Sequence, residues 1–129
     1  MIIFDTDVCI ELLHGNRNVP ARREQTDEAV GISFMTVGEL YYGAEKSDYP
    51  TRNHIAVEQF LLSVEVIQSD NQILKRFGRL KAELQNRGLP IADADALIAA
   101  TTLEKGTRLI TGNTKHFERI SELRIENWR

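Results

Sequence analysis

Blocks of apolar residues along the chain predict strands and helices in alternation. The first block, residues 2–4, is apolar without alternation, as in a strand covered on both faces of a parallel sheet. Residues suited to a helix cap follow, and apolar positions at helical spacing then predict a short helix that Gly15 ends. The later blocks predict, in order, a helix of unfixed bounds within 16–28, a strand at 29–34, a helix at 36–46 capped by Thr36, a helix from about 50 to 62, a strand at 64–67, helices at about 71–86 and 93–104, a strand at 108–110 and a short strand at 123–125.

This order of elements favours an α/β fold. Strands that alternate with helices predict a central, mostly parallel sheet of four to five short strands, with helices on both faces reached by right-handed crossovers. A chain of 129 residues can bury one core but is too short for two useful ones. We therefore expect a single domain over residues 1–129.

The composition of the chain indicates its cellular compartment and limits the class of protein to which it can belong. Cys9 is the single cysteine and lies in an apolar run, which predicts core packing and a reducing compartment. The chain opens on apolar residues without a basic leader, a long apolar segment or a cleavage signal, so we expect a cytoplasmic protein with no membrane partner. The net charge of −3 argues against a general nucleic-acid coating protein, but it is compatible with an acidic, metal-neutralised enzyme pocket.

Three acidic residues stand where an α/β fold can gather a ligand. Asp5 ends the first predicted strand, and ligands of open sheets collect outside the carboxyl ends of the strands. Asp95 falls in the first turn of its helix, where free backbone N–H groups favour negative charge. Carboxylates that share a partly desolvated pocket repel one another, and a hard cation relieves that repulsion. Oxygen ligands suit Mg²⁺ or Mn²⁺, so Asp5, Glu39 and Asp95 form a candidate metal site.

Each of these acids also has a purely structural interpretation. Asp5 or Asp7 suits the cap of the first helix. Glu39 suits a capping box with Thr36, and this is the stronger interpretation when the segment is taken alone.

Asp93 and Asp95 compete for one role at the start of their helix. We assign the cap to Asp93 and the site to Asp95, because the helix face of Asp95 also carries apolar residues and is directed towards the protein body. Several other polar or aromatic residues are assigned to packing or to a solvated surface, with contact to RNA as a second interpretation for the arginines: Tyr41, Tyr42, His14, His54, Arg17, Arg22 and Arg23.

Five different short sequence motifs follow one another along the chain. They are Asp-Thr-Asp at 5–7 after an apolar strand, Thr-Val-Gly-Glu-Leu at 36–40, Gly-Leu-Pro-Ile at 88–91 leading into Asp-Ala-Leu-Ile-Ala-Ala at 95–100, Leu-Ile-Thr-Gly-Asn at 109–113, and Ile-Glu-Asn-Trp at 125–128. In this combination the sequence resembles the PIN-domain ribonucleases and, within them, the VapC toxins of toxin–antitoxin pairs. The third motif is the most specific of the five.

The resemblance implies an endoribonuclease with a PIN-like fold that hydrolyses phosphodiester bonds in a structured RNA, tRNA or rRNA, and leaves 5′-phosphate and 3′-hydroxyl ends. It implies that Asp5, Glu39 and Asp95 hold Mg²⁺ or Mn²⁺. The family often has a fourth acid after the last motif strand, where this chain has Asn113 and, nearby, His116. Second-shell or fourth-position candidates are Thr6, Asp7, Asp93, Thr111 and Asn113.

The resemblance also implies partners. These are a VapB-type antitoxin that blocks the pocket, commonly with a basic side chain, a second copy of the chain in a homodimer, and operator DNA that is bound only through the antitoxin.

Two other functions remain open at this level. A non-catalytic PIN-like binding module would keep the fold and lose the site, for which Asn113 argues slightly. A receiver-type phosphorylation domain would use an aspartate after a middle strand, for which only Asp70 is available, and would leave Glu39 and Asp95 without a role.

Overall fold

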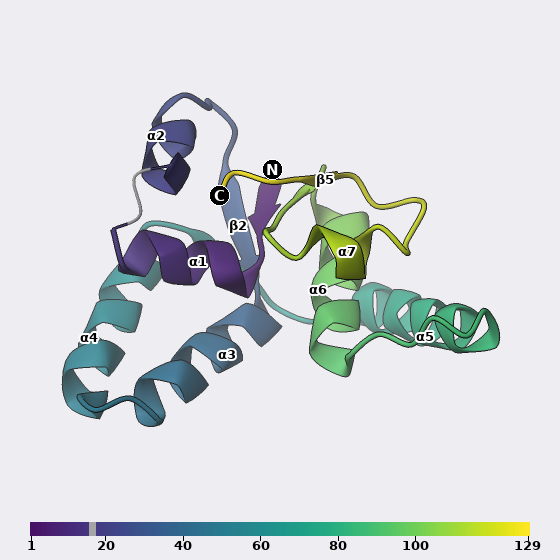
Figure 1. Cartoon of the computed structure of the whole chain (residues 1–129), viewed down its shortest axis with the longest axis horizontal. Helices are drawn as coiled ribbons and strands as arrows, with labels where there is room; N and C mark the ends of the chain where they lie inside the picture. Colours follow the sequence, from purple (N-terminus) through teal and green to yellow (C-terminus); the bar gives the residue numbers. More distant parts are fainter. Residues whose placement is uncertain (16–17) are drawn as a thin grey trace.

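One parallel sheet organises the molecule (Figure 1), as the sequence predicts. The structure is a computed structural model and describes residues 1–15 and 18–129. The strand order is β3-β2-β1-β4-β5, and all four pairings are parallel. The order reverses between β1 and β4, which is where open α/β sheets bind ligands. The strands are β1 Ile2–Phe4, β2 Val30–Ser33, β3 Glu65–Ile67, β4 Leu109–Ile110 and β5 Ile125–Glu126.

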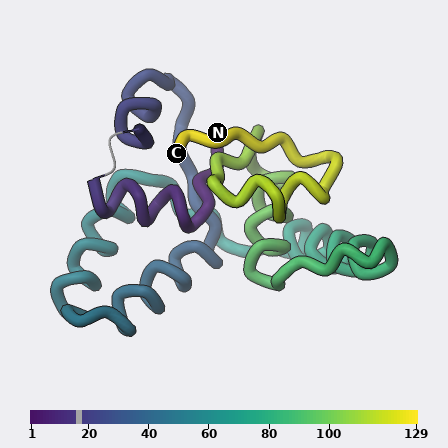
Figure 2. Tube along the Cα trace, in the orientation of Figure 1, coloured from purple at the N-terminus to yellow at the C-terminus, as the bar shows by residue number. Residues whose placement is uncertain are grey.

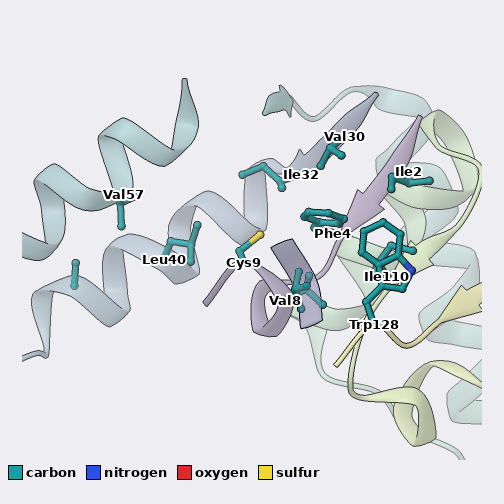
Figure 3. Close-up of a cluster of buried hydrophobic side chains, with 12 residues drawn as sticks. Ile2, Phe4, Val8, Cys9, Val30, Ile32, Leu40, Val57, Ile110 and Trp128 are labelled. Carbon is teal, nitrogen blue, oxygen red and sulfur yellow. The ribbon is translucent and has the colours of Figure 1, made fainter. Parts of the chain in front are cut away.

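Helices cover both faces of the sheet, and β1 contributes to the core on each side. Ile2 and Phe4 belong to the cluster under α1, α2, α3 and α4 (Figure 3), whereas Ile3 belongs to the cluster under α5, α6 and α7. Alternate residues of a strand point to opposite faces, so three apolar residues in a row are buried on both. The helices are α1 Thr6–Leu13, α2 Asn18–Glu24, α3 Phe34–Glu45, α4 Pro50–Leu61, α5 Asn71–Asn86, α6 Asp93–Lys105 and α7 Thr114–Phe117.

The predicted order of elements is confirmed, but the predicted start of α3 is wrong. Helix α3 begins at Phe34, because the Ser33 hydroxyl accepts a hydrogen bond from the Met35 N–H at 3.1 Å and caps the helix there. Thr36 is therefore an interior helical residue and is fully buried.

The end of the chain also differs from the prediction. The sequence did not indicate α7, and the last strand is Ile125–Glu126, not residues 123–125. Leu123 is instead buried in the core cluster under α5 and α6. None of the helices in the described ranges has the length and hydropathy needed to cross a membrane.

The segment that follows β5 runs back to the start of the chain (Figure 2). The Trp128 ring meets Phe4 edge to face, with the centroids 5.5 Å apart and the planes at 75°. The Arg22 guanidinium lies over the indole ring of Trp128, 5.4 Å from its centroid. This segment therefore packs against both the first strand and α2.

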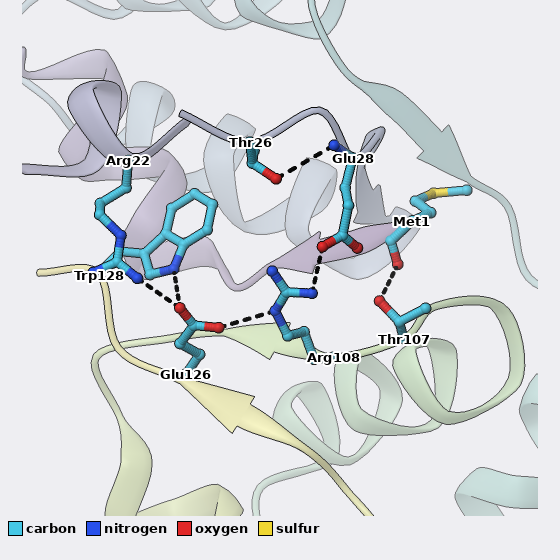
Figure 4. Close-up of polar contacts among 8 residues, drawn as sticks. All are labelled: Met1, Arg22, Thr26, Glu28, Thr107, Arg108, Glu126 and Trp128. Carbon is cyan, nitrogen blue, oxygen red and sulfur yellow. Dashed lines mark hydrogen bonds and ion pairs between the residues drawn. The ribbon is translucent and has the colours of Figure 1, made fainter. Parts of the chain in front are cut away.

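A polar network around Glu126 fixes this segment in place (Figure 4). The Glu126 carboxylate accepts hydrogen bonds from Trp128 Nε1 at 2.8 Å, Arg22 at 2.6 Å and Arg108 Nε at 2.9 Å, and Arg108 also pairs with Glu28 at 2.6 Å. The Trp128 N–H, helped by the two arginine charges, holds the pKa of Glu126 below its usual range against the opposing effect of burial. The network joins α2, β4 and β5 to residues 126–129.

We predict that Trp128→Ala lowers the free energy of unfolding by about 3–5 kcal/mol, because it removes a buried ring and leaves a cavity against Phe4. Urea denaturation followed by circular dichroism measures this change. Leu62→Ala is the control, since Leu62 is 89% exposed and its truncation should change the free energy by less than about 0.5 kcal/mol. Equal effects of the two substitutions would contradict the packing described for Trp128.

Candidate active site

Asp5 lies at the carboxyl end of β1, next to the end of β4, and is 2% exposed. Its Oδ1 accepts a hydrogen bond from the Thr6 N–H at 2.8 Å, and its Oδ2 accepts one from the Thr111 hydroxyl at 2.7 Å. Asp5 is thus the N-cap of α1 and also stands at the point where the strand order reverses. The capping and site interpretations of Asp5 are therefore compatible.

Burial raises the pKa of Asp5 from 3.8 to about 7. The hydrogen bond from Thr111 lowers it, the charge of Asp7 raises it, the Thr6 N–H lowers it and the charge of Asp95 raises it further. The carboxylates of Asp5, Asp7 and Asp95 therefore lie within electrostatic range of one another at this edge of the sheet.

Glu39 and Asp5 both accept hydrogen bonds from Thr6. The Thr6 hydroxyl donates to Glu39 Oε1 at 2.6 Å, while the Thr6 N–H donates to Asp5. Thr36 Oγ1 lies 3.1 Å from the same hydroxyl, and because that hydroxyl has one proton, Thr36 is its donor partner. The capping-box interpretation of Glu39 with Thr36 is therefore wrong: Glu39 lies beyond the first turn of α3 and faces Thr6.

Asp7 is held from two directions through its Oδ2 atom. That atom accepts the Gly112 N–H at 2.9 Å and lies 3.3 Å from Arg129 Nη1, and Arg129 also pairs with Glu11 at 2.8 Å. The other carboxylate oxygen, Oδ1, is buried and has no hydrogen-bond partner in the described part of the chain. No sequence motif indicated Arg129, which is 122 positions from Asp7.

Asp95 lies in the first turn of α6, as predicted, and its side chain is 22% exposed. Burial raises its pKa, His116 lowers it and the charge of Asp7 raises it. His116 Nδ1 is 3.6 Å from Asp95 Oδ2, so this histidine is a neighbour of the acidic group.

The assignment of Asp93 as the cap of α6 is wrong. Ala92 is the N-cap and makes no side-chain capping bond. The Asp93 carboxylate is instead paired with Lys81 of α5 at 3.0 Å and is 62% exposed, which directs it away from Asp5.

The fourth-position candidates differ in what they contact. Thr111 is fully buried, and its hydroxyl accepts the Asn113 N–H at 2.9 Å while it donates to Asp5. Asn113 is exposed and precedes α7 as its N-cap, without a side-chain capping bond. The loop thus contributes the Thr111 hydroxyl and the Gly112 N–H to the acidic group.

The other polar candidates are engaged elsewhere in the fold. Arg22 binds Glu126, Arg23 donates to the Ser63 carbonyl at 2.6 Å, and His54 Nε2 lies 2.9 Å from Glu45. The interpretation of Arg17 lies outside the described residues. Asp70 caps α5 and pairs with Lys105 at 2.6 Å, so it lacks the free position that a phosphoacceptor would need.

The acids approach one another without forming a closed ligand cage. Within residues 1–15 and 18–129, no three carboxylate, imidazole or thiolate groups are gathered closely enough to enclose an ion. Glu39 is held towards Thr6, and Asp7 towards Gly112. The arrangement is therefore an open group of oxygen donors at the switch point of the sheet.

A largely apolar cavity of about 280 Å³ adjoins this group and includes Glu39 in its wall. It lies among α1, α3 and α4, and Ile10 on its rim is 41% exposed. The rest of the lining is made of small or apolar residues and a few polar ones: Leu13, His14, Leu40, Gly43, Ala44, Ser47, Asn53, Ala56 and Val57.

Comparison with known proteins defines the class of this fold and site. The family model described as PIN domain matches residues 2–123, and the chain belongs to this family. This membership confirms the predicted PIN-like α/β fold and excludes the receiver-type alternative.

The relatives place the chain more narrowly, among the VapC ribonucleases. Ribonuclease VapC2 of Haemophilus influenzae is 37% identical over 127 residues, which cover 98% of this chain and 96% of that protein. The tRNA(fMet)-specific endonuclease VapC of Shigella flexneri is 37% identical over 130 residues, with the same coverage of 98% and 96%. The crystal structure of DNA-bound VapBC from Salmonella typhimurium superposes with a TM-score of 0.93 at 36% identity, over 99% of this chain and 98% of that one.

We predict that the metal-free protein loses stability as the pH rises from about 4 to 7, because the folded state binds a proton at Asp5 that the unfolded chain releases near pH 3.8. Asp5→Asn removes this proton uptake, and its amide can still accept the Thr6 N–H and donate to Thr111. At pH 8 the variant should be more stable by about 1–3 kcal/mol. Urea unfolding in EDTA at pH 4 and pH 8 measures the difference, and parallel pH profiles would contradict the raised pKa.

Proposed function

We propose that this chain is a metal-dependent endoribonuclease that acts as the toxin of a VapBC-type pair. The observation that carries the proposal is the placement of Asp5 and Glu39 on the two donor groups of Thr6, beside Asp95, at the switch point of the sheet. The VapC relatives support the reaction class. The proposed substrate is a structured RNA, and the proposed metal is Mg²⁺ or Mn²⁺.

The acidic group fits a hard divalent ion. Its donors are carboxylate oxygens, with hydroxyl groups behind them, which is the donor set that Mg²⁺ and Mn²⁺ prefer. Asp5, Asp7 and Asp95 repel one another, as the pKa values of Asp5 and Asp95 record. Asp7 Oδ1 is buried without a partner, so it has an unused lone pair for such an ion.

Asp5, Glu39 and Asp95 would hold the ion, which when bound lowers the pKa of a water and stabilises the leaving oxygen. The chain's own residues prepare this site. Thr6 fixes Asp5 and Glu39 relative to each other, and Thr111 fixes the second oxygen of Asp5. Such outer hydrogen bonds orient ligands and commonly change metal affinity or activity by about 10–100-fold when removed.

We predict that Asp5→Asn and Asp95→Asn each lower RNA cleavage at least about 100-fold, because each removes a charged metal ligand. The assay incubates purified protein with tRNA(fMet) or rRNA, with and without Mg²⁺ or Mn²⁺, and maps the product ends. Asp93→Asn is the matched control: it lies two residues from Asp95 on α6, is paired with Lys81, and should leave cleavage within about twofold.

Two results would contradict this proposal. Cleavage that persists in EDTA, or that is equal in the wild type and both site variants, would exclude the proposed chemistry. Binding of RNA without any cleavage would favour the alternative of a non-catalytic PIN-like module.

The proposed partner is a VapB-type antitoxin, and the cavity among α1, α3 and α4 is its proposed docking surface. The solved Salmonella and Rickettsia felis relatives are VapBC complexes bound to DNA. The cavity is apolar, has an exposed Ile10 at its rim and reaches Glu39, so an apolar segment seated there would bring a neighbouring basic side chain to the acids. Operator DNA would be bound through the antitoxin, and a homodimer remains part of the proposal.

We predict that Gly43→Leu weakens binding of the antitoxin encoded beside this chain by at least about tenfold, since a leucine would fill the cavity. A Cβ at Gly43 meets no atom within 4 Å, so α3 should tolerate the change. Gly78→Leu on α5 is the matched control, because its Cβ also meets nothing and it lies outside the cavity. Titration calorimetry measures both affinities, and equal affinities would rule out this surface.

A further inference from the structure

Asp7 carries an unsatisfied oxygen that the proposed ligand set does not use. Its Oδ1 is the one buried side-chain oxygen or nitrogen without a hydrogen-bond partner among the non-exposed residues described. A buried polar atom without a partner costs about 1–3 kcal/mol, and in native proteins it commonly indicates an ion, a water or a functional group at that position.

The surrounding bonds place Asp7 beside Asp5. Asp5 Oδ2 binds the hydroxyl of Thr111, and Asp7 Oδ2 binds the N–H of Gly112, the next residue of the same loop. The two carboxylates thus hydrogen-bond to consecutive residues of one loop, and the charge of Asp7 acts on Asp5. Each therefore has one oxygen fixed by the loop after β4, and Asp7 keeps its Oδ1 free.

The loop is built for this close approach. A Cβ at Gly112 would lie 2.8 Å from Asp7 Oδ2, and 2.5 Å from Arg129 Cδ, which is closer than real Cβ atoms come to other atoms. A larger residue would have to displace the Asp7 carboxylate or the Arg129 side chain from its position. The residue between Thr111 and Asn113 is thus fitted to Asp7.

We propose that Asp7 is a metal-facing carboxylate of this site, and that it supplies the fourth acid in place of the uncharged Asn113. The inference rests on the proposed function, which assigned Asp5, Glu39 and Asp95 to the ion. Gly112 and Arg129 orient Asp7 through Oδ2, so that Oδ1 remains available. Arg129 is then a positioning residue that offsets part of the negative charge when no ion is bound.

The competing explanation is that Asp7 only anchors Arg129. In that case the carboxylate would matter for the packing of residues 126–129, and not for the ion. Glu11 provides a way to separate the two explanations, because it pairs with the same guanidinium at 2.8 Å but lies one helical turn beyond Asp7 on α1.

Titration of the RNA-free protein with Mn²⁺ tests the proposal, with free Mn²⁺ followed by electron paramagnetic resonance. We expect Asp7→Asn to weaken Mn²⁺ binding at least about tenfold, because a charged ligand becomes neutral. The amide oxygen can still accept the Gly112 N–H, which preserves the fold. Glu11→Gln, which removes the other partner of the same guanidinium, should stay within about twofold of the wild type. Asp7→Ser is a second variant, and urea unfolding without metal confirms that each variant is folded.

The outcomes distinguish this inference from the proposed function. Wild-type affinity in both Asp7 variants, with weaker binding in Asp5→Asn, would overturn the role of Asp7 and leave the proposed function intact. If the wild type binds no Mn²⁺, or Asp5→Asn binds it as tightly, both proposals fail. Equal losses of Mn²⁺ affinity in Asp7→Asn and Glu11→Gln would show that Asp7 acts only as an anchor for Arg129.

Discussion

The arrangement of this molecule depends on keeping the Asp5 carboxylate buried at the end of β1. A buried carboxylate without partners costs several kcal/mol, so its hydrogen bonds must come from the fold itself. The Thr6 N–H supplies one from the start of α1, and the Thr111 hydroxyl supplies the other from the end of β4. The second bond requires β4 to lie directly beside β1. This pairing of β1 with β4 is the point at which the strand order reverses. The sheet topology and the acidic group are thus two aspects of one requirement.

At the carboxyl edge of the sheet, several carboxylates lie close together and their mutual repulsion is unfavourable. The charge of Asp7 raises the pKa of both Asp5 and Asp95, and that of Asp95 raises the pKa of Asp5, while the nearby basic side chains of His116 and Arg129 lie against Asp95 and Asp7 respectively. Proteins accept such conflict mainly at functional sites, where a ligand resolves it. In this VapC-type PIN domain, the repulsion among the acids is therefore a stronger indication of a ligand site than any distance between them.

Sequence patterns predicted the elements that are fixed locally. Residues 71–86 form the long helix as expected, and Asp95 lies in the first turn of α6 as expected. The failures involve contacts between distant segments. Thr36 is the cap that the sequence pattern predicts for α3, whereas Ser33, at the end of β2, caps the helix in the structure. Lys81 draws Asp93 away from the cap, and no local pattern records that pairing.

The separation of Asp5 and Thr111 by 106 positions has a consequence during translation. A ribosome must complete most of the chain before the hydroxyl that holds Asp5 has emerged, and later still before Arg129 reaches Asp7. Until then, the acids are parts of an unfinished sheet and have no fixed relation to one another. The hydrogen bonds that hold the Asp5 and Asp7 carboxylates therefore form only after nearly the whole chain has been made.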